Sequence, residues 1–303
     1  MTAAMPDYES GYVDVNDTKL YYEISGSGTP LILVHGFSLD RRMWDDQFAM
    51  LSEDYRVIRY DVRGFGKSSD APTTPYSYPD DLLGLMDALG TEKAHLVGLS
   101  MGGAIVVDFA VEHPSKILSL VPVDAPLGGV DWVTDFPQRM GVAAGLANEV
   151  GIEAALKLWL EDELLVPAMN NPACAPALGE IIGDYSGWHW TSGAKGAGRD
   201  TPTVNSLGVI NSPTLVIVGE HDLIDFHAMG DVMAEGISGA RKVVIPGVGH
   251  MSNMEDPATF NKILLEFLSG VPDTRPDPST DREVMPGWVM DQRYETPRDS
   301  TAF

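Results

Sequence analysis

The sequence Gly-Leu-Ser-Met-Gly at positions 98–102 presents a serine, Ser100, with a glycine two residues to either side. The apolar run 95–97 comes directly before it and a helical pattern follows, so Ser100 is predicted to occupy a tight turn between a strand and a helix. Glycine is needed at both flanking positions because a side chain there would collide with the turn. Such a turn lifts the hydroxyl group out of the sheet and places it at a helix N-terminus, whose N–H groups favour negative charge. Ser100 is therefore the candidate nucleophile.

A serine hydroxyl group is a weak nucleophile, and it needs a base that is oriented by an acid. Asp222 follows the apolar run 214–218, and His250 follows the run 243–245. Both residues would then lie at the carboxyl ends of strands, where open α/β sheets place their sites. We therefore expect Asp222 to orient His250 and His250 to act as the base. Asp124, at the end of another such run, is a less favoured alternative for the acid.

A third element, His-Gly-Phe at 35–37, closes the apolar run 31–34. The glycine would let the backbone approach a reacting carbonyl group. The backbone N–H groups of Phe37 and Met101 are then expected to form an oxyanion hole. His35 itself is expected to pack and to form hydrogen bonds rather than to catalyse.

These motifs require alternating strands and helices to position them. Short apolar runs rich in β-branched residues predict strands, most of them covered on both faces, at 31–34, 57–60, 95–97, 117–123, 214–218 and 243–245. Helical patterns lie between them, including one that begins near Met101 and must end before Pro114 and a last one that Asp256 caps. The alternation predicts an α/β fold with a mostly parallel, doubly wound sheet. Residues 11–24 instead predict a hairpin that forms an antiparallel edge.

The alternation stops in the middle of the chain. Residues 126–211 show helical patterns and little strand signal, so they are expected to form a helical cap inserted into the sheet domain. The core domain is then predicted to comprise residues 1–125 and 212–270.

Residues 271–303 have a different composition, with scattered prolines and acidic residues that interrupt any helix. They are predicted to form a tail rather than a domain. Trp288 and Tyr294 suggest that part of this tail docks on the rest of the protein.

The composition limits the possible partners and location. In the 303 residues, 44% are hydrophobic and 21% are charged, which is typical of a globular protein. The 20 Lys and Arg residues face 44 Asp and Glu residues, a net charge of −24, so neither nucleic acid nor an anionic membrane is an expected partner. The one cysteine, Cys174, cannot form an internal disulfide. Neither a secretory signal nor an apolar run of ~18 residues is visible, so a cytoplasmic protein is expected.

Taken in order, the motifs at 35–37, 61–68, 98–103, 219–222 and 249–250 resemble the α/β-hydrolase superfamily, over about residues 10–270. This resemblance implies Ser100 as nucleophile, His250 as base and Asp222 as its acid partner. It also implies that backbone N–H groups of Phe37 and Met101 bind the oxyanion and that segment 61–68 is structural. The segments 59–64 and 85–90 look like those of the 3-oxoadipate enol-lactonase branch, and that branch is similar to the carboxylesterases.

We therefore expect a serine hydrolase that cleaves a small carboxylic ester or lactone through an acyl-enzyme, with no metal or organic cofactor. The inserted segment has few cations for a dicarboxylate substrate. Its large apolar side chains are candidates for the substrate pocket instead, namely Trp132, Met140, Trp159 and Trp188. The alternatives are a C–C bond hydrolase or a perhydrolase with the same triad, or a non-catalytic binding protein with a hydrolase fold. The sequence leaves the oligomeric state open.

Overall fold

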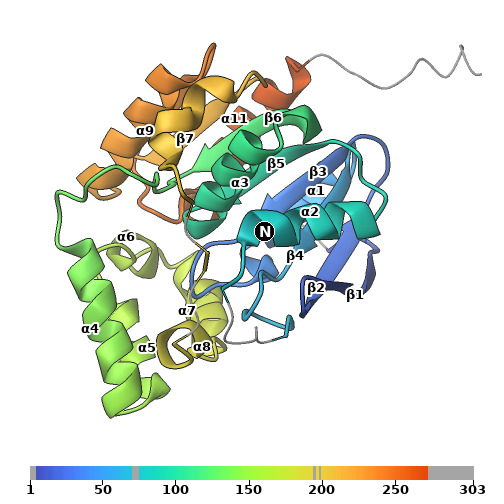
Figure 1. Ribbon diagram of the computed structural model, residues 1–303. Helices are drawn as coiled ribbons and strands as arrows, with labels where there is room; N and C mark the ends of the chain where they lie inside the picture. Colours follow the sequence, from blue (N-terminus) through green and yellow to red (C-terminus); the bar gives the residue numbers. More distant parts are fainter. Residues whose placement is uncertain (1–4, 70–74, 194–195, 198, 272–303) are drawn as a thin grey trace, which may run out of the picture. The chain divides into compact units, whose positions relative to one another are not determined.

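The computed structural model describes residues 5–69, 75–193, 196–197 and 199–271 (Figure 1). All of the elements described here belong to one compact unit, residues 1–272. The tail predicted for residues 271–303, with Trp288 and Tyr294, lies outside the described residues except for Val271.

The predicted α/β architecture is confirmed by a sheet of eight strands in the order β1-β2-β4-β3-β5-β6-β7-β8. The strands are β1 (Glu9–Val15), β2 (Thr18–Ser25), β3 (Pro30–Val34), β4 (Arg56–Tyr60), β5 (Ala94–Leu99), β6 (Ile117–Val123), β7 (Leu215–Gly219) and β8 (Arg241–Ile245). The six strands from β4 to β8 in this order are parallel to one another. Every residue of β5 and β7 is buried, which explains why these strands read as continuous apolar runs.

The antiparallel edge is formed by β1 and β2, as the pattern of residues 11–24 predicted. β1 pairs antiparallel with β2, and β2 pairs antiparallel with β4. Asn16 and Asp17 make the turn with φ values of 42° and 62°. These are residue types that tolerate the left-handed conformation, so a tight hairpin forms at this point.

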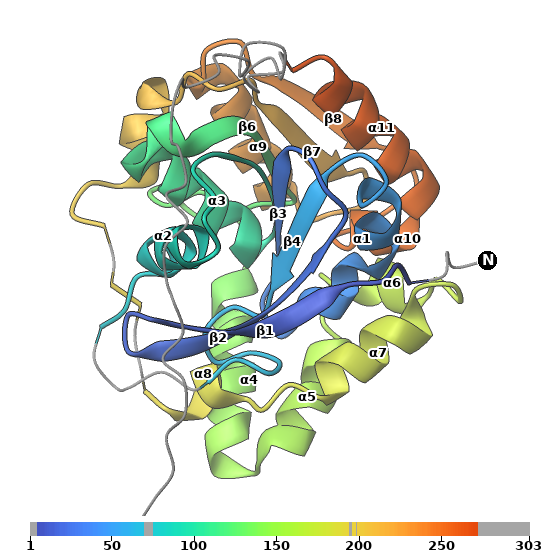
Figure 2. The same cartoon turned by 90° about the vertical axis from the view of Figure 1, so that its right-hand side faces the viewer.

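Helices cover both faces of the sheet. They are α1 (Asp45–Leu51), α2 (Tyr78–Ala88), α3 (Met101–Glu112), α9 (Ile224–Gly236), α10 (Ser252–Glu255) and α11 (Pro257–Ser269), with 3₁₀ turns η1 (Arg41–Trp44), η2 (Pro114–Lys116) and η3 (Thr203–Val209). Figure 2 shows α2 and α3 on one face and α1 and α11 on the other. The Asp256 carboxylate accepts a hydrogen bond from the Thr259 amide at 3.0 Å and so caps α11.

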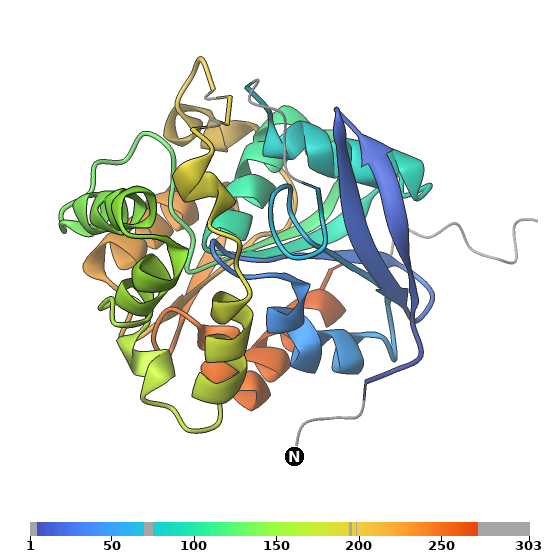
Figure 3. The ribbon, with the colours of Figure 1, turned by 90° about the horizontal axis from the view of Figure 1, so that it is seen from below.

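Between β6 and β7 the described residues form five further α-helices: α4 (Phe136–Glu149), α5 (Ile152–Leu160), α6 (Val166–Met169), α7 (Ala175–Gly183) and α8 (Trp188–Thr191). α4 packs against α5 and α8, and α7 packs against α5, α6 and η1. Figure 3 views the protein from the side on which these inserted helices lie. In the part of the chain that the structure describes, no helix is both long and apolar enough to cross a membrane.

Candidate active site

Ser100 occupies the turn between β5 and α3, with φ of 54° and ψ of −119°. Few residues other than glycine adopt such a backbone conformation, and it is found mostly at functional sites. A Cβ atom added to Gly98 would lie 2.2 Å from the carbonyl oxygen of Gly102. One added to Gly102 would lie 2.2 Å from the carbonyl oxygen of Val34. Both glycines are therefore required for the turn to pass this closely between β3 and the start of α3.

His250 and Asp222 meet from the loops that follow β8 and β7. Nδ1 of His250 lies 2.9 Å from Oδ2 of Asp222, and the backbone N–H of Leu223 donates to Oδ1 of Asp222 at 2.7 Å. An ionised carboxylate only accepts hydrogen bonds, so Nδ1 carries the proton and Nε2 of His250 is left as an acceptor. Burial lowers the pKa of His250 to about 4. The ring is thus neutral at neutral pH, as a general base must be.

Ser100 and His250 line one cavity of about 260 Å³. It lies where β3, β5, β6 and β8 end, and the inserted segment contributes to its lining. The side chains that this segment contributes are all apolar: Pro126, Trp132, Phe136, Met140, Trp159, Leu164 and Leu165. The polar side chains of the lining are Ser38, Ser100 and His250. The cavity therefore presents a serine hydroxyl group and an imidazole ring in otherwise apolar surroundings, as small-molecule sites commonly do.

Three of the four predicted pocket residues, Trp132, Met140 and Trp159, line this cavity. Trp188 instead lies against the loop that follows β4, where a Cβ atom added to Gly64 would be 2.7 Å from its ring. Trp190, two residues further along the chain, packs against Phe37 instead, with ring centroids 5.8 Å apart. The sequence could not separate the two tryptophans, because the direction of each depends on how the short helix α8 packs.

Phe37 and Met101, the two predicted oxyanion donors, also line the cavity. A Cβ atom added to Gly36 would lie 3.4 Å from Cβ of Ser100, so this loop passes close to the candidate nucleophile. Ser38 holds the loop in place: its φ is 59°, and Nε1 of Trp159 donates a hydrogen bond to its Oγ at 2.8 Å. Sequence reasoning missed Ser38, because no local motif links it to a tryptophan on α5.

The histidine of the 35–37 motif has a structural position. Nε2 of His35 accepts a hydrogen bond from the Val62 amide at 2.8 Å, and Nδ1 lies 2.8 Å from the carbonyl oxygen of Gly36. Burial lowers the pKa of His35. The ring thus links the loop after β3 to the loop after β4.

The segment 61–68 forms a turn around the buried carboxylate of Asp61. Asp61 accepts hydrogen bonds from the backbone and the guanidinium group of Arg41, both at 2.9 Å, and from the Lys67 amide at 2.8 Å. A Cβ atom added to Gly66 would lie 2.4 Å from Oδ2 of Asp61. Asp61 is thus enclosed by the turn that it stabilises.

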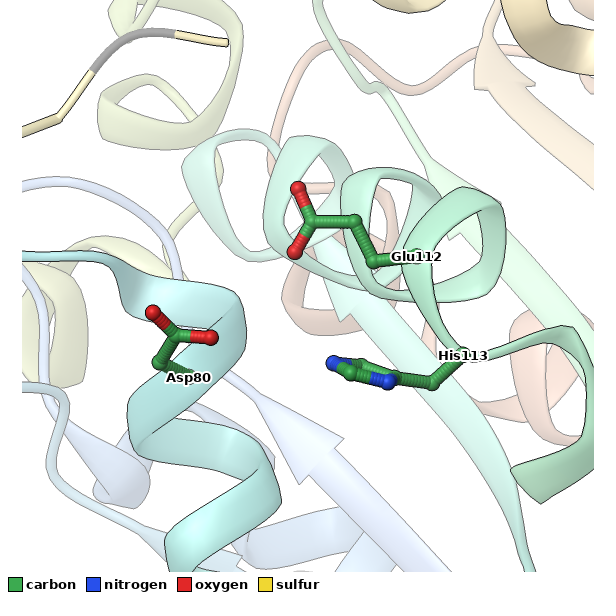
Figure 4. Close-up of side chains that lie close together, drawn as sticks. All are labelled: Asp80, Glu112 and His113. Carbon is green, nitrogen blue, oxygen red and sulfur yellow. The ribbon is translucent and has the colours of Figure 1, made fainter.

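A separate charged group lies between α2 and the end of α3. Figure 4 shows Asp80, Glu112 and His113 facing a common space, and one side-chain atom of each lies within 4.8 Å of the others. Arg199 forms an ion pair with Glu112. This carboxylate is therefore already balanced by a guanidinium group, and we assign the group no chemical role.

Comparison with known proteins gives a consistent result. The model of the "Alpha/beta hydrolase family" matches residues 31–263. The protein named 3-oxoadipate enol-lactonase 1 from Acinetobacter baylyi is 28% identical over 258 residues, 83% of this chain and 94% of its own. The enol-lactonase structure from Burkholderia xenovorans LB400 has a TM-score of 0.74 at 30% identity, covering 86% of this chain and 100% of that one. A thermophilic esterase from Thermogutta terrifontis, with malate bound, has a TM-score of 0.75 at 30% identity, covering 87% and 99%.

Proposed function

Because the chain belongs to the alpha/beta hydrolase family, we propose that it is a serine hydrolase that cleaves a carboxylic ester or lactone through an acyl-enzyme. One observation carries the proposal. Ser100, on a strained turn, shares a cavity with His250, whose Nδ1 lies 2.9 Å from the Asp222 carboxylate. The similar proteins named enol-lactonase and esterase support the same reaction class.

The first half of the proposed reaction forms the acyl-enzyme. Nε2 of His250 accepts the Ser100 proton as Oγ attacks the substrate carbonyl carbon, and Asp222 stabilises the resulting imidazolium. The negative oxygen of the tetrahedral intermediate is bound by the backbone N–H groups of Phe37 and Met101, at the N-terminus of α3. The intermediate collapses, His250 gives its proton to the leaving alcohol, and the acyl group remains on Ser100.

The second half releases the acid. The neutral His250 takes a proton from a water molecule, which attacks the acyl carbon of the ester on Ser100. The imidazolium then returns its proton to Ser100 Oγ as the ester bond breaks. If the substrate is a lactone, the alcohol and the acid are parts of one molecule, so the product is a single hydroxy acid.

The lining of the cavity supports an apolar, uncharged substrate group. Arg139, on α4, is held by ion pairs with Asp135, Asp162 and Glu163. A substrate carboxylate would therefore find no free guanidinium group there, and its burial against Trp132 and the other apolar side chains would be costly.

Residues 126–211 are assigned the role of a cap in this scheme. Their side chains close the cavity from above the strand ends, so they would exclude water and select the substrate. We place the protein in the cytoplasm, since its one cysteine, Cys174, is a buried free thiol and the fold uses no disulfide.

The test is hydrolysis of p-nitrophenyl esters from acetate to octanoate by the wild type and by Ser100→Ala. The wild type is expected to turn over with a chain-length optimum, and Ser100→Ala is expected to be inactive. Ser38→Ala is the matched control, because it removes a hydroxyl group from the same cavity and should cost no more than about tenfold.

Absence of turnover by the folded wild type would contradict a general esterase and would leave a selective lactonase or one of the alternatives. The alternatives then separate by substrate. A C–C bond hydrolase would cleave vinylogous diketones, and a perhydrolase would form a peracid from a carboxylic acid and hydrogen peroxide. A binding protein would show a ligand-induced rise in melting temperature with no turnover of any of these substrates.

A further inference from the structure

Asp124 is a second buried aspartate beside the proposed acid–base pair. It follows the last residue of β6 with a φ of 45°, and it is 0% exposed. Its Oδ1 accepts a hydrogen bond from the Gly219 amide at the end of β7, and its Oδ2 lies 2.7 Å from the hydroxyl group of Ser252, the first residue of α10. Asp124 therefore joins the ends of two strands to the helix that follows His250.

Asp124 also lies against the proposed acid itself. One side-chain atom each of Asp124, Asp222 and His250 lies within 4.8 Å of the others. Two ionised carboxylates cannot hydrogen-bond to each other, because both only accept. A single proton between them turns a repulsive contact into a favourable one.

No arginine or lysine among the residues that the structure describes is paired with either carboxyl group. The charged groups nearby add negative charge instead: Glu255 on α10 and Asp225 on α9 both act on Asp222. His250, from the loop before α10, is the titratable cation that acts on Asp124. The pair therefore cannot be neutralised by a permanent counter-charge.

Asp222 is better placed than Asp124 to keep the negative charge. It accepts hydrogen bonds from Nδ1 of His250 and from the Leu223 amide. Burial raises the pKa of Asp222 well above its ordinary value, although the hydrogen bonds from the Leu223 amide and Asp124 oppose this shift. Burial and the Asp222 charge together raise the pKa of Asp124 well above its ordinary value.

We propose that Asp124 is a neutral carboxylic acid in the folded protein at neutral pH, and that its hydroxyl group donates a hydrogen bond to the Asp222 carboxylate. Its carbonyl oxygen accepts from Gly219, and its hydroxyl oxygen accepts from Ser252. Asp124 is thus a positioning residue that fixes Asp222 without adding a second charge. This role rests on the proposed function, in which Asp222 orients His250.

The proton on Asp124 can be counted without any substrate. An unfolded chain has this aspartate ionised between about pH 6 and 8, so a neutral Asp124 must bind about one proton on folding. The free energy of unfolding should then fall with rising pH more steeply in the wild type than in Asp124→Asn. The difference between the two slopes should correspond to about one proton. Denaturant unfolding of the full chain across this pH range measures the difference.

Asp61 is the matched control. It is also 0% exposed, but the Arg41 guanidinium group lies 2.9 Å from its Oδ2. Burial raises the pKa of Asp61 from its ordinary value and the Arg41 guanidinium group opposes this shift. With this cation in contact, we expect Asp61 to be ionised in both the folded and the unfolded chain at these pH values. Asp61→Asn is therefore expected to lower the midpoint of unfolding and to keep the pH slope of the wild type.

Equal pH slopes for the wild type and Asp124→Asn would overturn the proposal, because Asp124 would then be ionised in the folded protein. If Asp124→Asn does not fold, infrared absorption of the wild type at about pH 7 decides. The carbonyl stretch of a buried, protonated carboxyl group should be present in the folded protein and lost on unfolding, and its absence would overturn the proposal. Because neither readout needs turnover, failure of this proposal is distinguishable from failure of the ester assay.

Discussion

Two clusters of buried charged side chains differ in what balances their charge. The arginine-paired cluster comprises Glu23, Arg41, Arg59 and Asp61, and its guanidinium and carboxylate groups approach to between 2.7 and 2.9 Å. The histidine-paired cluster comprises Asp124, Asp222 and His250. In the first cluster every carboxylate has a permanent cation beside it. In the second the partner is an imidazole ring, which is neutral until it takes up a proton.

The difference separates buried charges that stabilise from buried charges that can do chemistry. Burial would raise the pKa of Glu23, but the Arg59 and Arg41 guanidinium groups outweigh it and hold the pKa below the ordinary value. This carboxylate therefore stays ionised and paired. In the histidine-paired cluster burial dominates, raising the pKa of Asp124 and lowering that of His250. Groups whose pKa values are shifted from their ordinary values in this way are typical of functional sites.

The largest effect is expected for Asp222→Asn. The asparagine amide would donate to Nδ1 of His250 and so favour the tautomer that cannot accept the Ser100 proton. We expect kcat for ester hydrolysis to fall by about 10⁴-fold with little change in melting temperature. Asp61→Asn is the control from the other cluster, and its folded fraction should keep kcat. Equal losses of kcat in both variants would contradict the proposal that only the histidine-paired cluster acts in catalysis.

Arg41→Met is expected to have the largest effect on stability. It leaves Glu23 and Asp61 buried without one of their cations, which costs about 3–5 kcal/mol of unfolding free energy. Denaturant unfolding at neutral pH measures the loss. The control is Lys262→Met, since Lys262 pairs with Glu266 at 3.9 Å on the surface, with side chains 76% and 65% exposed. Its removal should cost at most about 0.5 kcal/mol. A similar cost for both variants would contradict the stabilising role of the arginine-paired cluster.

The two clusters are also expected to differ in how they respond to pH. Because burial lowers the pKa of His250 to about 4, kcat/KM should hold as the pH falls below 6.5 and decline only near pH 4. Glu23 contributes stability that is present above its unfolded pKa and is lost as the pH falls through its lowered folded pKa. Melting temperatures at each pH must therefore accompany the kinetics, so that protonation of His250 is separated from unfolding. A decline near pH 6.5 in the folded protein would show that the Asp222 charge outweighs burial.

The smallest effect is expected where the cavity holds a neutral hydrogen bond. Trp159→Phe and Ser38→Ala each remove the bond between α5 and the loop that carries Phe37. Each should lower kcat/KM by no more than about tenfold, and the double variant should lose no more than either single variant. Additive losses would mean that the two side chains act independently, without coupling through the 2.8 Å hydrogen bond.

Local sequence patterns were sufficient to predict most of the strands, turns and helix ends. The buried strands, the turn at Asn16 and Asp17 and the cap at Asp256 were all visible, because each depends on residues a few positions apart. The glycines at 98 and 102 were visible for the same reason, since close backbone approach excludes a side chain whatever surrounds the turn. The sequence therefore determined the fold class and the order in which Ser100, Asp222 and His250 follow the strand ends.

Tertiary packing decided which side chains meet. Trp159 reaches Ser38 across 121 positions, and Ser252 reaches Asp124 across 128. Trp190 rather than Trp188 faces Phe37, and this depends on how α8 packs. Periodicity gives the face of an element but not the partner that this face will contact. The partners, and with them the charge balance around Asp124 and Asp222, exist only after distant segments have folded together.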